Sequence, residues 1–193
     1  DLLWRRRLAQ AALWNGDSTA ALAAALIIAR KTQLRADWEQ VVLLAPGNYD
    51  YELELEARMA ILQQSPNDES LIEAIKQNYI LLGKEAQGLQ RFQKIYQRHP
   101  NPTTLKALAE MAELSGDELL SGYYYEQYFA AYGYDIEKVI NIIDNYWLLD
   151  RQKDAYLLAE AALQSSQEPA LIRRRAAMAY YLGNWQEGHL NLP

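Results

Sequence analysis

Apolar residues along the chain recur at the spacing of a helix rather than that of a strand. Helical spacing places side chains three or four residues apart on one face, whereas a half-buried strand alternates apolar and polar residues. Two runs of helical spacing are Leu71, Ile75, Tyr79 and Leu82, and Val139, Ile142, Ile143 and Tyr146. No segment shows the alternation typical of a strand. The pattern predicts an all-α protein.

A turn signal interrupts the helical spacing every 33 or 34 residues. It consists of a residue free to take left-handed backbone angles, followed by a polar residue, which together end one helix and begin the next. The pairs are Gly16 and Asp17, Tyr49 and Asp50, Gly83 and Lys84, Gly116 and Asp117, Asp150 and Arg151, and Gly183 and Asn184.

A second break follows each turn about seventeen residues later. These breaks are Gln33, Pro66, Pro100, Gly133 and Gln167. Proline ends a helix because it lacks a donor and clashes with the preceding turn. Each repeat is therefore expected to be two short helices, in a single solenoid over 1–193. The predicted repeats are 2–34, 35–68, 69–101, 102–135, 136–168 and a partial 169–193.

The repeat register also predicts the core. One helix pair cannot bury both of its faces, so neighbouring pairs must stack. The first helices are expected to bury Leu8, Val41, Ile75, Leu108 and Ile142, and the second helices Ile28, Ile61, Ile95, Tyr128 and Ala162. Small residues follow each inner turn, where the helices of a pair approach closely, at Ala21, Gly88, Ser121, Ala155 and Gly188.

This arrangement resembles the tetratricopeptide-repeat family, whose units have small residues at the helix contact, an aromatic residue in the second helix and proline at the end. The repeat 69–101 matches best, with Tyr79, Gly83, Gly88, Phe92, Ile95 and Pro100 in place. The resemblance covers the whole chain and implies a right-handed α-α superhelix (a TPR-like solenoid) of about five and a half helix pairs. Sel1-type and HEAT-type arrays have longer periods, which would drift out of register.

The repeat 35–68 departs from the pattern. Glu54 and Arg58 replace the expected small and aromatic residues, and the stretch 46–48, Pro-Gly-Asn, is expected to end the first helix early. These departures question the geometry of this repeat and leave the architecture unchanged.

Composition and charge narrow the function classes. The net charge is -6 and the pI about 5.0, which argues against a general nucleic-acid binder because a phosphate backbone rewards excess Lys and Arg. Without cysteine, disulfides, thiolate zinc sites and cysteine nucleophiles are excluded. No apolar run approaches the roughly 20 residues of a membrane span. A first residue other than methionine suggests a fragment of a longer protein.

The chain carries few residues that indicate catalysis or the binding of a metal or cofactor. His99 and His189 are the only histidines and neither has a second ligand at metal-binding spacing. There is no glycine-rich phosphate loop after a strand and no G-x-S-x-G motif. We therefore expect no catalytic residue, no metal, no cofactor and no enzymatic activity.

The resemblance implies a binding site on the concave wall formed by the exposed face of the first helices. Counted from the turns, this wall comprises Arg6, Gln10, Trp14, Glu39, Glu73, Gln77, Lys106, Glu110, Glu113, Asp144, Trp147, Arg173 and Tyr180. Its middle is acidic, which favours a basic or amine-bearing ligand and departs from family members that hold a peptide carboxylate. The alternative is that these carboxylates only keep the groove hydrated.

The stretch 8–17, Leu-Ala-Gln-Ala-Ala-Leu-Trp-Asn-Gly-Asp, resembles the periplasmic repeat arrays of bacterial exopolysaccharide export proteins, above all of the Pel type. This resemblance implies a scaffold in biofilm matrix secretion whose partners are a periplasmic polysaccharide-modifying enzyme or a cationic polysaccharide. The alternative is a cytoplasmic adaptor or regulator that binds a basic peptide or helix of another protein. A third reading, an enzyme, would need a catalytic domain outside this segment.

Overall fold

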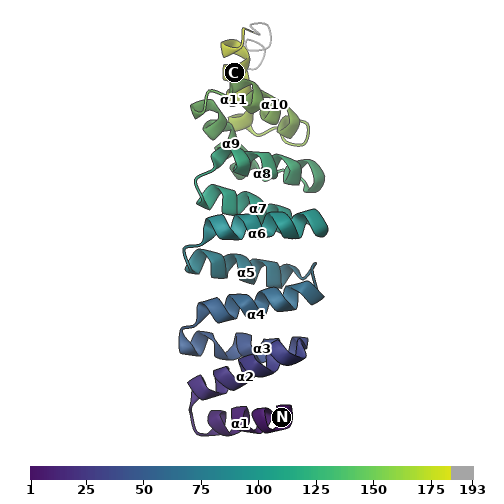
Figure 1. The fold of residues 1–193 in the computed structure, drawn as a ribbon. Coiled ribbons are helices and arrows are strands. Elements are labelled where there is room, and N and C mark those ends of the chain that lie inside the picture. Colours follow the sequence, from purple (N-terminus) through teal and green to yellow (C-terminus); the bar gives the residue numbers. More distant parts are fainter. Residues whose placement is uncertain (184–193) are drawn as a thin grey trace. The chain divides into compact units, whose positions relative to one another are not determined.

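The structure, a computed structural model, describes residues 1–183, which form eleven α-helices and one short 3-10 helix without a strand (Figure 1). The predicted positions Asn184, Gly188 and His189 lie outside these residues. The elements are α1 Leu2–Trp14, α2 Ser18–Thr32, α3 Arg35–Leu44, η1 Pro46–Asn48, α4 Tyr51–Gln64, α5 Glu69–Leu81, α6 Glu85–Arg98, α7 Pro102–Leu114, α8 Glu118–Tyr132, α9 Ile136–Leu148, α10 Gln152–Leu163 and α11 Pro169–Tyr181.

The six predicted turn residues all have positive φ. The angles are 74° at Gly16, 58° at Tyr49, 63° at Gly83, 77° at Gly116, 60° at Asp150 and 83° at Gly183. Three of these residues are followed by an aspartate that caps the next helix, because Asp17, Asp50 and Asp117 each accept a hydrogen bond from the backbone N–H three residues on. The same two residues thus end one helix and begin another.

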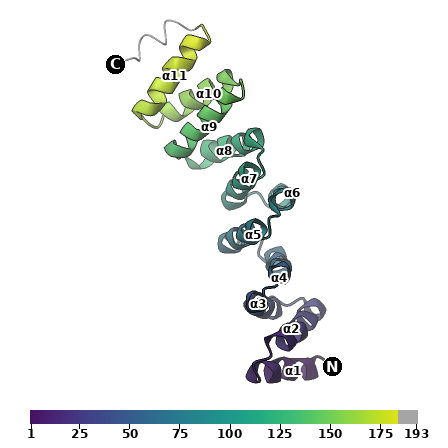
Figure 2. The ribbon, with the colours of Figure 1, turned by 90° about the vertical axis from the view of Figure 1, so that its left-hand side faces the viewer.

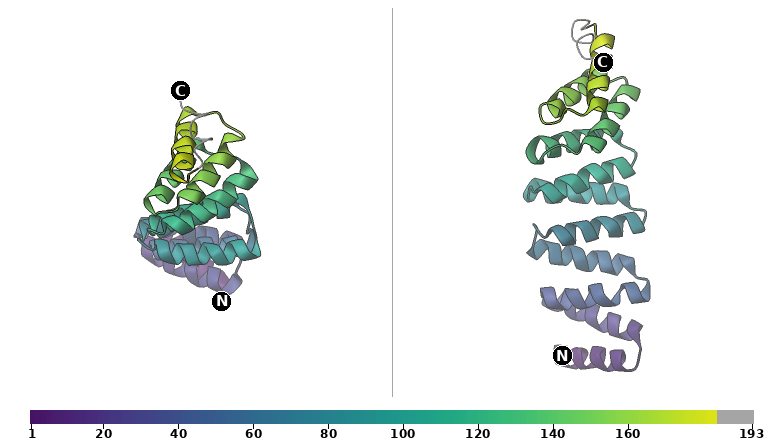
Figure 3. Two further views of the ribbon diagram at one scale, coloured as in Figure 1. Left: turned by 90° about the horizontal axis from the view of Figure 1, so that it is seen from above. Right: turned by 180° about the vertical axis from the view of Figure 1, so that it is seen from behind.

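The contacts divide the chain into two compact units, Asp1–Ala107 and the residues from Leu108 onward, with the boundary inside α7. We describe each unit by itself, and a single solenoid over the whole chain stays a prediction. In the first unit, α3 and α5 lie on one side and α2, α4 and α6 on the other (Figure 2). The view from behind shows consecutive helices of this unit side by side (Figure 3).

Each unit has its own apolar core. In the first, one cluster joins Leu22 and Ala29 of α2 to Trp38 and Val41 of α3 and to Ile61 of α4. In the second, aromatic residues of α8 pack against the apolar faces of α9, α10 and α11; this cluster includes Tyr125, Phe129, Val139, Ile142, Ile143, Tyr146, Ala155, Leu158, Leu171 and Met178. Every core helix therefore depends on neighbours from adjacent repeats.

The predicted core is wrong at Leu8, which is 45% exposed. Helix α1 packs against α2, and the residue that it buries is Ala12, one turn further along the same face. Ile95 and Tyr128 are only partly buried, while their neighbours in the same helices, Phe92 and Phe129, are buried.

The irregular repeat folds around a polar network in place of the small and aromatic pair. The Arg58 guanidinium lies 2.5 Å from the Glu54 carboxylate and donates a 2.7 Å hydrogen bond to Asn78 Oδ1. Asn78 Nδ2 in turn donates to Glu54. Helix α3 ends at Leu44 after ten residues and η1 follows, so the Pro-Gly-Asn stretch shortens the first helix as predicted.

Candidate functional site

The thirteen predicted wall residues all lie on first helices and none of them is buried. The first unit carries Arg6, Gln10 and Trp14 on α1, Glu39 on α3, Glu73 and Gln77 on α5 and Lys106 on α7. The second carries Glu110 and Glu113 on α7, Asp144 and Trp147 on α9 and Arg173 and Tyr180 on α11. We call this set the first-helix wall, and we describe its two parts separately.

A buried carboxylate joins the first two helices of the wall. Arg6 of α1 donates hydrogen bonds of 2.7 and 2.8 Å to the two carboxylate oxygens of Asp37 on α3, and Thr32 donates a third of 2.7 Å. Asp37 is 5% exposed. The hydrogen bonds from Arg6 lower the pKa of Asp37 despite its burial, so it is charged at neutral pH.

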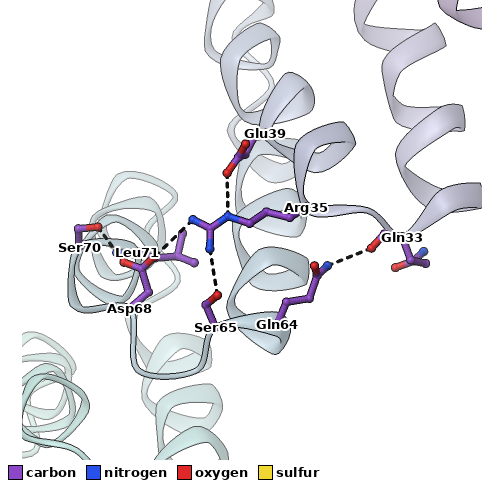
Figure 4. Close-up of polar contacts among 8 residues, drawn as sticks. All are labelled: Gln33, Arg35, Glu39, Gln64, Ser65, Asp68, Ser70 and Leu71. Carbon is purple, nitrogen blue, oxygen red and sulfur yellow. Dashed lines mark hydrogen bonds and ion pairs between the residues drawn. The ribbon is translucent and has the colours of Figure 1, made fainter.

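Arg35, at the first position of α3, links α3 to the ends of α4 and α5 (Figure 4). It donates hydrogen bonds of 2.8 Å to Glu39 and 2.9 Å to Ser65, and it lies 3.5 Å from Asp68, the N-cap of α5. Hydrogen bonds from Ser70 and from the Leu71 N–H lower the pKa of Asp68. The junction therefore holds three successive helices by polar contacts.

On α5, Glu73 is surrounded by donors. Burial would raise its pKa, but hydrogen bonds from Lys76 and Gln77 and the charges of Lys76 and Lys106 together lower it. The Lys76 amine lies 2.8 Å from the carboxylate. Glu73 is thus held as an anion by its own helix and by α7.

In the second unit, cations of neighbouring first helices cover two wall carboxylates. The Lys138 amine donates to both oxygens of Glu113 at 2.8 and 2.6 Å and lies 4.8 Å from the Tyr125 ring centroid. Arg174 donates two hydrogen bonds of 2.7 Å to Asp144. Both pairs connect successive first helices, α7 with α9 and α9 with α11.

These contacts correct the charge that the sequence predicted for the wall. The prediction set its carboxylates against Lys106 alone, whereas Glu39, Glu73, Glu113 and Asp144 each pair with a cation outside the predicted set. Those cations are Arg35, Lys76, Lys138 and Arg174. The wall is therefore close to charge-balanced at these four positions.

A hollow opens in the wall between α1, α2 and α3. Its volume is about 400 Å³ and its polar lining includes the wall residues Arg6 and Gln10 together with Gln40. Leu13 and Leu44 add apolar surface. The hollow therefore combines apolar surface with polar groups at fixed positions, and such groups orient a ligand in a binding pocket.

Exposed aromatic side chains lie on both parts of the wall. Trp14 is 80%, Trp147 37% and Tyr180 52% exposed. Trp147 also contacts the ring of Tyr181 edge-on, with 5.1 Å between centroids. Tryptophan and tyrosine are enriched among the residues that carry most of the binding energy at protein interfaces.

Within residues 1–183, no group of three or more His, Asp or Glu side chains is arranged to hold a metal ion. No helix in this part of the chain has the length and apolar character needed to cross a membrane.

Neither a protein-family model nor a curated protein matches the sequence. Among solved structures, a chain in that of Naa15/Naa10 bound to HypK-THB is similar, with 15% identity and a TM-score of 0.57, over 95% of this chain and 29% of that one. MamA is similar with 9% identity and a TM-score of 0.52, over 81% of this chain and 87% of its own. A tetratricopeptide repeat protein from Parabacteroides merdae is 15% identical over 98% of this chain and 75% of its own, with a TM-score of 0.43.

Helix pairs without a strand in residues 1–183, together with the likenesses at TM-scores of 0.57 and 0.52, define an all-α fold of tetratricopeptide-like helix pairs. The fold class is the one expected from the repeat. At these identities the likeness describes the fold alone.

Proposed function

We propose that this chain is a non-catalytic scaffold that binds another protein on the first-helix wall. The hollow of about 400 Å³ beside Arg6 and Gln10 carries the proposal, because it joins apolar surface to polar groups held in place. The bidentate contact with Asp37 fixes the Arg6 guanidinium at its edge. A partner segment that enters the hollow meets a preorganised surface, which lowers the entropic cost of binding.

The structure changes the expected chemistry of the ligand. A basic group that approaches Glu39, Glu73, Glu113 or Asp144 has to compete with a cation already paired there. We therefore favour a partner segment that uses aromatic and amide contacts, with the net charge of -6 attracting a basic partner over longer range. A purely cationic polysaccharide is the less favoured ligand of this wall.

The proposed cellular role of the scaffold is based on sequence resemblance. The stretch 8–17 supports a periplasmic role in exopolysaccharide export, with a polysaccharide-modifying enzyme as the partner. The alternative remains a cytoplasmic adaptor or regulator that binds a basic peptide or helix. Fractionation of the source cells separates the two, because export requires the chain and its partner to be recovered together from the periplasmic fraction.

Paired truncations test the wall itself, using the partner isolated with the chain. The variant Gln10→Ala with Trp14→Ala removes two exposed groups that make no ion pair, and it should weaken the partner's affinity by about tenfold or more. The matched control, Ile27→Ala with Lys31→Ala, truncates exposed residues of α2, a second helix, and should leave affinity unchanged. Equal affinity of both variants would refute the assignment.

A further inference from the structure

A second cleft lies away from the first-helix wall, between the second helices α4 and α6. Its volume is about 410 Å³. Met59, Leu62 and Pro66 on one side and Ile95 on the other give it apolar surface. Among the described residues, no aspartate or glutamate lines it. This composition is unusual in a chain whose net charge is -6.

Three cations border the cleft on α6. Arg91, Lys94 and Arg98 follow helical spacing, so they share one face of the helix. All three are exposed, and the row extends over roughly 10 Å at the rise of an α-helix. The apolar Ile95 lies beside them on the same stripe, which makes this face both basic and hydrophobic.

These cations differ from most others of the first unit because no carboxylate of the described residues is paired with them. Only the charge of Arg91 acts on a neighbour, Tyr79, where it opposes the rise in pKa that burial causes. Arg91, Lys94 and Arg98 form no ion pair or hydrogen bond with residues 1–183. By contrast, Arg30 binds Glu56 through two hydrogen bonds of 2.9 and 2.7 Å, and Lys84 pairs with Glu52. The positive charge of the cleft is therefore available to a ligand.

We propose that the cleft between α4 and α6 binds an acidic amphipathic helix of another protein. Carboxylates at successive turns of such a helix match the spacing of Arg91, Lys94 and Arg98, and an apolar side chain between them enters beside Met59 and Ile95. A helix in a groove between helices is a recurrent mode of peptide recognition. An anionic polysaccharide would satisfy the cations but would leave the apolar surface without a partner. This second surface does not depend on the proposed function of the first-helix wall.

The test uses a fluorescein-labelled 16-residue peptide with glutamates at positions 4, 7 and 11 and leucines at positions 8, 12 and 15, which form an acidic stripe and an adjacent apolar stripe, with alanine and glutamine elsewhere. Its binding to the chain is measured by fluorescence anisotropy. The triple variant Arg91→Glu, Lys94→Glu and Arg98→Glu should raise Kd by about tenfold or more. The control Arg7→Glu, Lys31→Glu and Lys153→Glu changes the net charge equally at exposed positions elsewhere and should change Kd less than about threefold.

A second variant separates the apolar contribution from the charge. Met59→Gln keeps every cation and should still raise the Kd of the designed peptide several-fold. A scrambled peptide of the same composition should bind more weakly than the designed one. Circular dichroism and thermal unfolding verify that each variant is folded. Three results would overturn the proposal: no binding of the designed peptide, equal loss in the control triple variant, or equal binding of the scrambled peptide or of alginate at matched charge.

Discussion

Arg6 and Asp37 form a two-pronged ion pair between the first helices of successive repeats, with both guanidinium–carboxylate distances below 3 Å. Because the Asp37 carboxylate is buried, its loss of hydration is offset mainly by Arg6 and Thr32. The Arg6→Ala variant should lower the free energy of unfolding by about 1–3 kcal/mol, since it leaves a buried acceptor incompletely satisfied. Urea unfolding measures this loss. The neighbouring exposed Arg7→Ala is the control, and equal effects of the two substitutions would contradict the account.

The same carboxylate makes stability depend on pH. Its folded-state pKa is lowered by the hydrogen bonds from Arg6, so its contribution is complete above the unfolded-state pKa of ~3.9 and is lost as the pH falls through the folded value. Asp37→Asn should flatten the fall in unfolding free energy between about pH 4 and pH 2. Parallel urea titrations of the two proteins provide the measurement. If the unfolding free energy of both proteins fell with the same slope in this range, Asp37 would not contribute to the pH dependence of stability.

The polar network of the irregular repeat predicts that Glu54, Arg58 and Asn78 contribute to stability as a unit, so that removing one member costs more than removing all three. Arg58→Ala removes the cation beside Glu54, which is buried, and should cost about 3 kcal/mol. The triple variant Glu54→Ala, Arg58→Phe and Asn78→Ala removes the whole network and supplies an apolar ring, so it should lose less stability than Arg58→Ala. Chemical denaturation of both variants decides this. A triple variant less stable than the single one would mean that the network is not a substitute for apolar packing.

Gly122 of α8 predicts a steric limit in the second unit. A Cβ at this position would lie 2.8 Å from Cε1 and Cζ of Tyr146. Tyr146 is buried, and its hydroxyl donates a 2.6 Å hydrogen bond to the Glu126 carboxylate. Gly122→Ala should destabilise the protein by about 1–2 kcal/mol, because overpacking outweighs the helix preference of alanine. Gly47→Ala has open space around it and serves as the control. Equal melting temperatures for both variants would rule out the predicted clash.

Much of the fold could be predicted because its signals are local. A residue free to adopt positive φ, followed by a helix cap, is visible in two adjacent letters, as at Gly16 and Asp17. Burial was less predictable. The repeat register assigned Leu8 to the core, but α1 packs against α2 in a way that leaves the Leu8 side chain exposed.

The charge of the first-helix wall could be predicted only in part. Pairs within one helix, such as Arg35 with Glu39, follow from a spacing of four residues. Pairs between helices, such as Lys138 with Glu113, join residues 25 apart and require the packed structure. The cleft between α4 and α6 was missed, although the spacing of Arg91, Lys94 and Arg98 is a signal that sequence reasoning could have used.

Site-specific photo-crosslinking in the source cells tests the scaffold assignment most directly. A photoreactive residue is placed at Gln10 or Gln77 on the first helices, or at Ala23 or Lys31 on α2, all of them exposed positions. The account predicts that one partner protein crosslinks at Gln10 and Gln77 and not at the α2 positions. Crosslinking of that partner only at Ala23 and Lys31, or no crosslinked protein at Gln10 and Gln77, would contradict it.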